Sequence, residues 1–358
     1  MSFASTNMTL ILPHGYSAKL APEMMEQAVE LLKNSFQKEF AARLKLRRVT
    51  APLFVLAGTG LNDDLSGVER AVSFPIRSMN EQRAEVVHSL AKWKRMKLGM
   101  YKIPPGYGLY TDMNAIRADE PLDQIHSLYV DQWDWEKTIR SENRSLPFLQ
   151  EIVREIFDVL KTMEENVYRE FHHITPALPD QIAFIHAEDL LKEYPNLSPK
   201  ERENEVTKRH KAVFIVGIGA KLSNGEKHDE RAPDYDDWST ETFWDFPAVK
   251  PNYFGLNGDL LIWNPIMEAA LELSSMGIRV DKTALVRQLD ICGCPERKNL
   301  MFHKALLEDR IPLSVGGGIG QSRVCQYLFR CAHVGEVQSS IWPEEMIEEC
   351  RQNGVILM

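Results

Sequence analysis

The sequence predicts an α+β fold, and three observations support this prediction. A long amphipathic helix begins at Pro22, where apolar residues recur at steps of three and four with charged residues between them. The unbroken apolar runs 212–219 and 259–263 indicate buried strands. Residues 128–136 alternate like a strand whose two faces meet different surroundings. Together these segments indicate a sheet with helices packed around it.

The beginning of the chain contains the unit that we expect to form a dimer. Residues 1–21 are an extension of low periodicity, and residues 22–358 are expected to form a single domain. The first helix leads to a strand predicted over 48–55, and Pro52 confines that strand to an edge or an interface, since proline cannot donate to a strand ladder. Helix and strand would leave apolar surface exposed in a monomer. We therefore predict a homodimer formed through residues 22–55.

The middle of the chain mixes strand and helix patterns. Residues 86–95 read as the end of a strand that enters a basic helix, and 108–120 alternates before its charges break the pattern. An amphipathic helix is predicted over 147–167. Residues 240–253, rich in aromatic side chains and proline, are predicted to be a loop insertion in the single domain.

Composition excludes several classes of protein. The chain has 358 residues, of which 44% are hydrophobic, and a net charge of -9, which argues against a protein that holds nucleic acid. Five cysteines, with Cys292 and Cys294 separated by one residue, fit neither a disulfide framework nor a zinc ribbon. The apolar runs are too short to span a bilayer. We expect a cytoplasmic protein that is not bound to membranes.

A glycine run near the C-terminus, 314–323 (SVGGGIGQSR), is the strongest candidate for ligand binding. Gly316, Gly317 and Gly318 carry no Cβ and so allow the backbone to approach a flat ligand closely. The apolar residues that follow predict a buried helix with Arg323 in its first turns, where both the guanidinium and the helix N-terminus favour an anion. The run is neither a P-loop nor a G-x-G-x-x-G fingerprint. Taken alone, it is also compatible with a simple chain reversal between strand and helix.

Four other groups of polar residues could carry chemistry, although each also has an ordinary structural interpretation. Arg117 with Glu120 could be a surface ion pair, and the strand face that presents Gln132 and Asp134 could be solvated. A capped basic helix would explain Ser89 and Lys94, and an exposed acidic loop would explain Asp236. A fifth group is less easily explained in this way. Its members are the carboxylates Asp259 and Glu272 with Ser275 and Arg279, a combination suited to magnesium and phosphate.

These motifs together resemble a known family. The glycine run with Arg323, the pair Arg117 and Glu120, and the helix that leads to Pro52 resemble motifs 3, 2 and 1 of class II aminoacyl-tRNA synthetases. More closely, four strings resemble the ammonia-dependent asparagine synthetases, also called aspartate-ammonia ligases. The strings are 88–95 (HSLAKWKR), 130–136 (VDQWDWE), 231–238 (RAPDYDDW) and 272–279 (ELSSMGIR). The N-terminal extension and the 240–253 loop depart from the family pattern but touch none of these strings.

The resemblance implies both a fold and a reaction. The implied fold is a mainly antiparallel sheet of six to seven strands flanked by helices, as in class II synthetases. The implied reaction activates the side-chain carboxylate of L-aspartate with ATP to give β-aspartyl adenylate and pyrophosphate, and ammonia then gives asparagine and AMP. ATP and Mg²⁺ are therefore the expected ligands besides aspartate and ammonia.

The resemblance also implies residue roles. Arg117 would stabilise the transition state at the α-phosphate, Arg323 would hold the triphosphate near the adenine, and Asp259 and Glu272 would hold magnesium. The remaining nucleotide ligands would be Glu120, Asp236, Ser275, Arg279, Gly316, Gly317 and Gly318. The implied aspartate pocket comprises Ser89, Lys94, Gln132 and Asp134, with Gln132 beside the reacting carboxylate. Asp63 is a candidate to receive ammonium and take its proton.

Two other classes of protein could also explain these motifs. A relative of aspartyl- or asparaginyl-tRNA synthetase would share the fold but would need an anticodon-binding module and a basic face. A catalytically silent protein that binds nucleotide or amino acid would be expected to lack Arg117, Asp259, Glu272 or Arg323, and the sequence retains all four. An active ligase therefore accounts best for the sequence.

Overall fold

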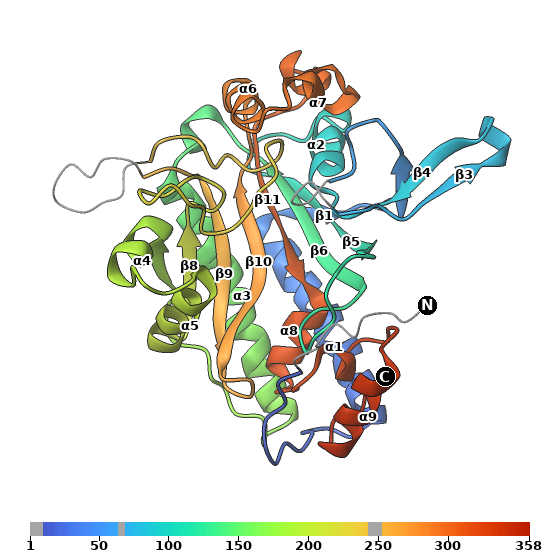
Figure 1. The fold of residues 1–358 in the computed structure, drawn as a ribbon, viewed down its shortest axis with the longest axis vertical. Helices are drawn as coiled ribbons and strands as arrows, with labels where there is room; N and C mark the ends of the chain where they lie inside the picture. The colour runs from blue at the N-terminus through green and yellow to red at the C-terminus, as the bar shows by residue number, and fades with distance from the viewer. Residues whose placement is uncertain (1–9, 64–68, 243–252) are drawn as a thin grey trace.

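The computed structural model describes residues 10–63, 69–242 and 253–358. Within these residues the chain forms one large sheet flanked by helices and a smaller sheet that projects from the body as an arm (Figure 1). Helices lie on both faces of the large sheet, and this arrangement confirms the α+β class. Among the described residues, no helix is long and apolar enough to cross a membrane.

The large sheet has eight strands within the described residues, in the order β1-β5-β6-β11-β10-β9-β8-β7. Its strands are β1 Leu46–Arg48, β5 Gly108–Ile116, β6 Tyr129–Thr138, β7 Ala183–His186, β8 Ala212–Val216, β9 Asn257–Asn264, β10 Ala269–Ile278 and β11 Ser314–Gly320. The five pairs from β5 to β8 are antiparallel, whereas β1 pairs with β5 and β7 pairs with β8 in parallel.

The expected sheet of six to seven strands is therefore corrected to a mixed sheet of eight. The interior is antiparallel, as predicted, and the two parallel pairs lie at the edges. The edge strands β1 and β7 have three and four residues. Strands this short carry too little alternation to be recognised in a sequence, and no local pattern reveals the direction of a partner strand.

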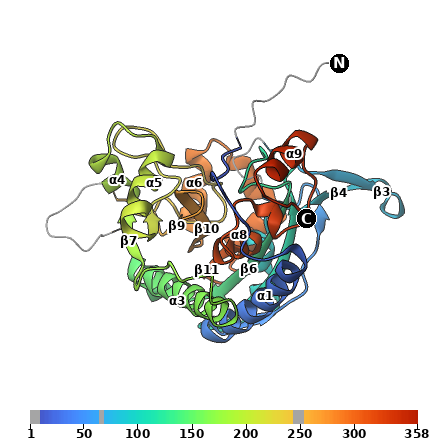
Figure 2. The same ribbon diagram turned by 90° about the horizontal axis from the view of Figure 1, so that it is seen from below.

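Helices on one face of the sheet enclose the main core. The α-helices within the described residues are α1 Pro22–Leu44, α2 Ala91–Met100, α3 Leu146–Glu170, α4 Ala187–Glu193, α5 Pro199–His210, α6 Lys282–Ile291, α7 Met301–Leu307, α8 Gln321–Leu328 and α9 Glu344–Gln352. Figure 2 shows α1 and α3 side by side across the sheet, and they are in direct contact. The ring of Phe36 in α1 stacks on Trp133 of β6, with 3.9 Å between the ring centroids. Burial of such aromatic pairs contributes strongly to core stability.

This packing corrects one argument for a dimer. The apolar side of α1 was expected to be open in a monomer, but it is buried within the chain against the sheet and α3. The predicted strand 48–55 is also divided: β1 ends at Arg48, and β2 (Phe54–Leu56) belongs to the second sheet. Pro52 lies between the two strands, where its missing N–H costs no ladder hydrogen bond.

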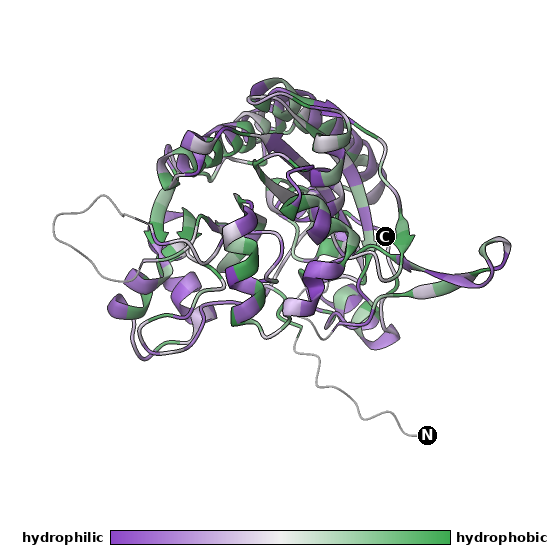
Figure 3. Ribbon diagram, turned by 90° about the horizontal axis from the view of Figure 1, so that it is seen from above, coloured by the Kyte–Doolittle hydropathy of each residue, from purple (hydrophilic) through white to green (hydrophobic). Residues whose placement is uncertain are grey.

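The second sheet forms the projecting arm and carries exposed apolar side chains. Its strand order is β2-β4-β3, with β3 at Ser73–Ile76 and β4 at Gln82–Val86. In Figure 3 the arm alternates between hydrophobic and hydrophilic stretches along its strands and is hydrophilic at its tip. The exposed apolar side chains are Leu53, Phe54, Leu56, Phe74 and Met79. Of the unit predicted to form a dimer, Leu53 and Phe54 are exposed on the arm, and Met24 and Leu31 of α1 are exposed as well.

On the other face of the sheet, two smaller apolar clusters leave the centre free. One cluster joins α4 and α5 to β8 and β9, and the other joins α6 and α7 to Met96 of α2. Between them the side chains of β6, β10 and β11 face a polar pocket. Residues 243–252, most of the predicted loop insertion, lie outside the described residues.

Candidate active site

One pocket of about 360 Å³ gathers most of the residues singled out in the sequence. Its walls come from β6, β10, β11 and the start of α8, together with the 117–128 hairpin loop and the 229–236 segment. The predicted site residues that line it are Asp63, Ser89, Arg117, Glu120, Gln132, Asp134, Asp236, Glu272, Ser275, Arg279, Gly317, Gly318 and Arg323. Lys94, Asp259 and Gly316 lie behind its walls.

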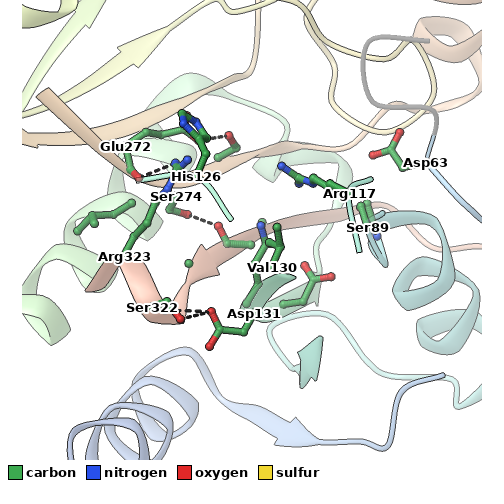
Figure 4. Close-up of a pocket in the computed structure, with 18 of the residues that line it drawn as sticks. Asp63, Ser89, Arg117, His126, Val130, Asp131, Glu272, Ser274, Ser322 and Arg323 are labelled. Atoms are coloured by element: carbon green, nitrogen blue, oxygen red, sulfur yellow. Dashed lines mark hydrogen bonds between the residues drawn. The ribbon is translucent and has the colours of Figure 1, made fainter. Parts of the chain in front are cut away.

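The pocket has two distinct ends. Figure 4 shows Arg323 near Glu272 and His126 at one end, and Arg117 near Ser89 and Asp63 at the other. Each end thus carries an arginine and a carboxylate: Arg323 with Glu272 at one end, and Arg117 with Asp63 at the other. A ligand with a long anionic part could contact both guanidinium groups at once.

The glycine run forms strand β11, in the middle of the sheet between β6 and β10, and not a turn. A Cβ at Gly316 would overlap the carboxylate of Glu136, and one at Gly318 would overlap the amide of Gln132. A Cβ at Gly317 would lie 2.6 Å from the Cβ of Met276 on the opposite side of the strand. Glycine is required here because the polar side chains of β6 lie across β11. The side chains of Glu136 and Gln132 thus occupy the space that larger residues on β11 would need, and this strand forms the floor of the pocket.

The helix after the glycine strand places Arg323 as predicted. Arg323 donates from Nη1 to the carbonyl oxygen of Glu272 at 3.1 Å and from Nε to that of Ile125 at 3.4 Å. The first residues of α8 have no cap from Gly320, but the carboxylate of Asp131 on β6 accepts from the backbone N–H of Ser322 at 3.0 Å and from its hydroxyl at 2.6 Å. Asp131 thus supplies the missing helix cap from a neighbouring strand.

The hairpin between β5 and β6 places Arg117 at the other end of the pocket. The backbone N–H of Arg117 donates to the carbonyl oxygen of Leu128 at 2.9 Å, which continues the β5-β6 pairing. Its guanidinium lies 3.7 Å from Glu120. Within the described residues, Arg117 Nε is buried and has no hydrogen-bond partner. Such a donor is costly to leave unpaired, which favours an anionic ligand here.

Strand β6 has the two faces that its sequence predicts. Trp133 and Trp135 are buried in the core, while Gln132 and Asp134 face the pocket. Asp134 is paired with Lys94, whose ammonium also donates to the carbonyl oxygens of Trp135 at 3.0 Å and Gly317 at 3.1 Å.

Lys94 does not line the pocket, and its expected role on the aspartate α-carboxylate stays a prediction. Its side chain is fully buried, and its three N–H groups have three acceptors. Burial lowers the pKa of Lys94, and the neighbouring carboxylates Asp134 and Glu136 oppose that effect. The contacts make Lys94 a support for Asp134 and for the glycine strand.

Buried charges beneath the floor fix Arg279. Its guanidinium pairs with Glu136, at 3.0 Å from Nη2, and with Asp236. Arg144 donates to the carbonyl oxygen of Arg279 at 2.6 Å. Arg279 and Asp236 thus line the pocket as a pre-formed ion pair, which holds the guanidinium still at small entropic cost.

Asp259 and Glu272, the predicted metal ligands, belong to the adjacent strands β9 and β10. Asp259 is opposite Ser275, and the register shifts between Glu272 and Ser274. The Ser275 hydroxyl donates to Glu272 at 2.9 Å. Burial raises the pKa of Asp259 to about 7 against the charge of Arg231. Burial also acts to raise the pKa of Glu272, but Arg323, Arg231 and Lys200 outweigh it and bring that pKa to about 2.

A cation already lies against these carboxylates. The Arg231 guanidinium forms an ion pair with Asp259, and its Nη2 donates to Ser275 Oγ at 3.0 Å. The described residues contain no cluster of three or more acidic, histidine or cysteine side chains that would hold a metal alone. Two carboxylates do suit Mg²⁺ that also binds nucleotide phosphates, because Mg²⁺ in nucleotide sites takes one or two protein carboxylates. The residues therefore fit the expected ion.

Asp63 is 4% exposed and lines the pocket. Its carbonyl oxygen lies 3.1 Å from Nδ1 of His88, and its backbone N–H donates to the side chain of Asn62 at 3.0 Å. Ser89 nearby accepts a hydrogen bond from the backbone N–H of Ala91 at 3.1 Å. These contacts hold the chain on either side of the arm strand β4 at the pocket end where Arg117 lies.

Comparison with known proteins gives the family. A family model described as aspartate-ammonia ligase matches residues 23–354. The chain belongs to the aspartate-ammonia ligase family. A protein of Parabacteroides distasonis named aspartate-ammonia ligase is 57% identical over 349 residues, which is 98% of this chain and 99% of that protein. One of Bacteroides fragilis with the same name is 54% identical over 95% of this chain and 97% of that protein.

Solved structures with the same fold are class II synthetases. The asparaginyl-tRNA synthetase of Pyrococcus horikoshii, complexed with asparaginyl-adenylate, aligns with a TM-score of 0.62 at 14% identity and covers 89% of this chain and 70% of that chain. The Entamoeba histolytica asparaginyl-tRNA synthetase, also with asparaginyl-adenylate, gives 0.61 at 13% identity, with coverage of 88% and 66%. At this identity the likeness establishes the class II synthetase fold of this member of the ligase family.

Several pocket residues were not identified from the sequence of this ligase family member. Arg231 stands in one of the four recognised strings, but a loop string does not reveal which carboxylate its arginine meets. His126 and Tyr235 also line the pocket. Alternation along β6 places Asp131 on the face opposite Gln132 and Asp134, yet Asp131 reaches the pocket wall through the start of α8. Only the tertiary position of α8 reveals this contact.

Proposed function

We infer that this protein synthesises L-asparagine from L-aspartate and ammonia with ATP, releasing AMP and pyrophosphate. The observation that supports this most is the placement of Arg117 and Arg323 at opposite ends of one pocket (Figure 4). Between them lies the glycine floor, where a nucleotide can rest with its α-phosphate directed to Arg117. Family membership fixes the overall reaction, and the roles of individual residues below are proposals.

Adenylate formation uses the arginines and the glycine floor. Arg323 holds the triphosphate near the adenine, which rests over Gly317 and Gly318. The β-carboxylate of aspartate attacks the α-phosphorus, the bond to the bridging oxygen of pyrophosphate breaks, and Arg117 stabilises the charge that develops on the α-phosphate. Glu120, 3.7 Å from Arg117, orients that guanidinium. The fixed ion pair of Arg279 with Asp236, and the hydroxyl of Ser275, complete the nucleotide pocket.

The aspartate pocket lies at the end where Ser89 and Asp134 line the wall. We propose that Asp134 receives the substrate ammonium, Ser89 binds the α-carboxylate and Gln132 lies beside the reacting carboxylate. Lys94 acts through Asp134, because its ammonium is already bound by three protein acceptors. A direct contact of Lys94 with substrate would require one of these hydrogen bonds to be exchanged.

Magnesium and ammonium complete the reaction. Asp259 and Glu272 would hold Mg²⁺, which when bound neutralises phosphate charge and so assists the departure of pyrophosphate. Asp63 binds ammonium and takes one proton. The ammonia nitrogen then attacks the activated carbonyl carbon, a further proton is lost, and the bond to AMP breaks.

We also propose that the protein is a cytoplasmic homodimer that does not bind nucleic acid. Five free thiols suit a reducing compartment. The exposed apolar side chains of the arm, and the edge strand β1 beside it, provide a surface for a second copy.

A product assay tests the function. Purified protein with aspartate, ATP, magnesium and ammonium is expected to form asparagine and AMP in equal amounts. Omission of ammonium should stop asparagine formation while exchange of labelled pyrophosphate into ATP continues. Formation of ADP as the stoichiometric product would contradict the proposal, because no residue of the pocket is assigned to γ-phosphoryl transfer.

A further inference from the structure

Arg231 is the cation paired with Asp259, one of the two proposed metal ligands, and neither the family resemblance nor the reaction assigns it a role. It lies on the segment between β8 and β9, and its side chain is 11% exposed in the pocket wall. Gly219 makes room for it: a Cβ there would lie 2.8 Å from the Cβ of Arg231. Arg231 can therefore take this position only because residue 219 has no side chain.

Arg231 lies close to three carboxylates of the pocket region: Asp259, Asp236 and, through Ser275, Glu272. Its Nη2 contacts both Asp259 and Ser275, and its Nε is 3.9 Å from Asp236. Ser275 in turn donates to Glu272. Among the described residues, Arg231 Nε is buried and makes no hydrogen bond. Arg231 thus balances the charge of Asp259 directly and is linked to Glu272 through the Ser275 hydroxyl, while Arg323 also balances the charge of Glu272.

We propose that Arg231 is a resident counter-cation that keeps divalent metal out of this site until the nucleotide arrives. With Arg231 in place, Asp259 and Glu272 have little uncompensated charge to attract a free divalent ion. The phosphates of ATP bring further negative charge, and magnesium bound to them can then compete with the guanidinium for the carboxylates. Metal and nucleotide therefore enter together, and Arg231 is a positioning residue for the metal ligands.

The inference rests on the proposed function only in assigning Asp259 and Glu272 to the metal. Its test needs no turnover. Binding of Mn²⁺, which carboxylates accept in place of Mg²⁺, can be followed by the electron paramagnetic resonance of the free ion in protein without nucleotide. Failure of asparagine synthesis and failure of this inference are thus separate results.

The decisive variant is Arg231→Met, which keeps much of the side-chain length and removes the charge. We expect nucleotide-free wild-type protein to bind Mn²⁺ weakly and Arg231→Met to bind it at least about tenfold more tightly, since a unit charge near two buried carboxylates has a large effect on a divalent ion. Arg231→Lys keeps a charge and should stay close to wild type. The gain should disappear in Arg231→Met combined with Glu272→Gln.

Arg144→Met is a matched control. Arg144 has a similar exposed fraction, 12%, and is paired with the carboxylate of Asp237, but it does not line the pocket. This variant changes the net charge equally and should leave Mn²⁺ affinity unchanged. If Arg231→Met folds poorly, Arg231→Gln, which keeps a donor for Asp259, should show the same gain, and Mn²⁺ should raise its unfolding temperature.

Equal Mn²⁺ affinity in wild type and Arg231→Met would overturn the inference. So would tight binding by the nucleotide-free wild type, or a gain that survives Glu272→Gln. The same gain in Arg144→Met would reduce the effect to net charge and would also overturn it.

Discussion

At the scale of single residues, the site depends on two arginines that have no close carboxylate partner. Arg117 Nε is buried and has no partner within the described residues, and Arg323 contacts only backbone carbonyl oxygens through the hydrogen bonds described above. Neither guanidinium is neutralised as closely as Arg279, which has two buried carboxylates. Arg231 and Arg279 also line the pocket, and both have closer carboxylate partners than the two arginines proposed to bind the triphosphate.

The first prediction concerns these two arginines. Arg117→Ala and Arg323→Ala are each expected to lose on the order of 10² to 10³ in rate, as removal of a donor to developing charge typically does. Steady-state kinetics with varied ATP is the measurement. Arg48→Ala, which removes an exposed arginine paired with Asp112, is the control and should retain activity. Near-normal rates in either pocket variant would refute its role.

The second prediction separates the two half-reactions at Asp63. Asp63→Ala should retain aspartate-dependent pyrophosphate exchange, which reports adenylate formation, while asparagine synthesis falls by a factor of about 10². The deficit should shrink as pH rises, because more of the nucleophile is then free ammonia and needs no base. Equal loss of exchange and synthesis at every pH would make Asp63 a structural turn residue.

At the scale of elements, strand β11 shows how packing decides which residue a position accepts. Gly316 and Gly318 lie beneath side chains of β6, whereas Gly320, at the start of α8, has no atom closer to an added Cβ than 3.5 Å. Gly320 also has a φ of -65°, which any residue adopts. Packing therefore requires glycine at positions 316 and 318 but not at position 320.

The third prediction follows from this difference. Gly316→Ala would displace Glu136 from Arg279 and is expected to cost about 1–3 kcal/mol of unfolding free energy, the usual range for overpacking. Gly320→Ala is the matched control and should change stability by less than about 0.5 kcal/mol. Chemical denaturation gives both values. Equal stability of the two variants would show that Glu136 can move away without cost.

At the scale of the whole molecule, the arm and the main domain differ in how they bury apolar surface. The helices of the main domain cover the sheet, while Phe54 and Phe74 of the arm pack edge to face at 5.2 Å and stay exposed. Large exposed apolar side chains on a projecting sheet mark an association surface. The expected partner is a second copy of the chain.

The fourth prediction is therefore a dimer that depends on the arm. Light scattering at micromolar concentration should give twice the chain mass, and Leu56→Lys should shift the protein toward the monomer, because a buried unpaired charge destabilises an interface. Ile347→Lys on α9, which replaces an equally exposed apolar residue outside the arm, should leave the mass unchanged. A monomeric wild type with full activity would exclude the proposed dimer.

The sequence by itself determined the elements and the family. Helical periodicity predicted α1 and α3, alternation assigned the two faces of β6, and four rare strings identified the ligase family, because each of these signals is contained in consecutive residues. It also gave many of the residues that line the pocket, although their binding roles stay predictions.

The tertiary structure decided what depends on contacts between distant residues. It made the sheet mixed, because strand direction is fixed by partners and not by local pattern. It turned the glycine run into a central strand, because Glu136 and Gln132 fill the space above it. It also showed that Lys94 pairs with Asp134 and that Arg231 pairs with Asp259, a proposed metal ligand. An ion pair between residues far apart in sequence leaves no local signal.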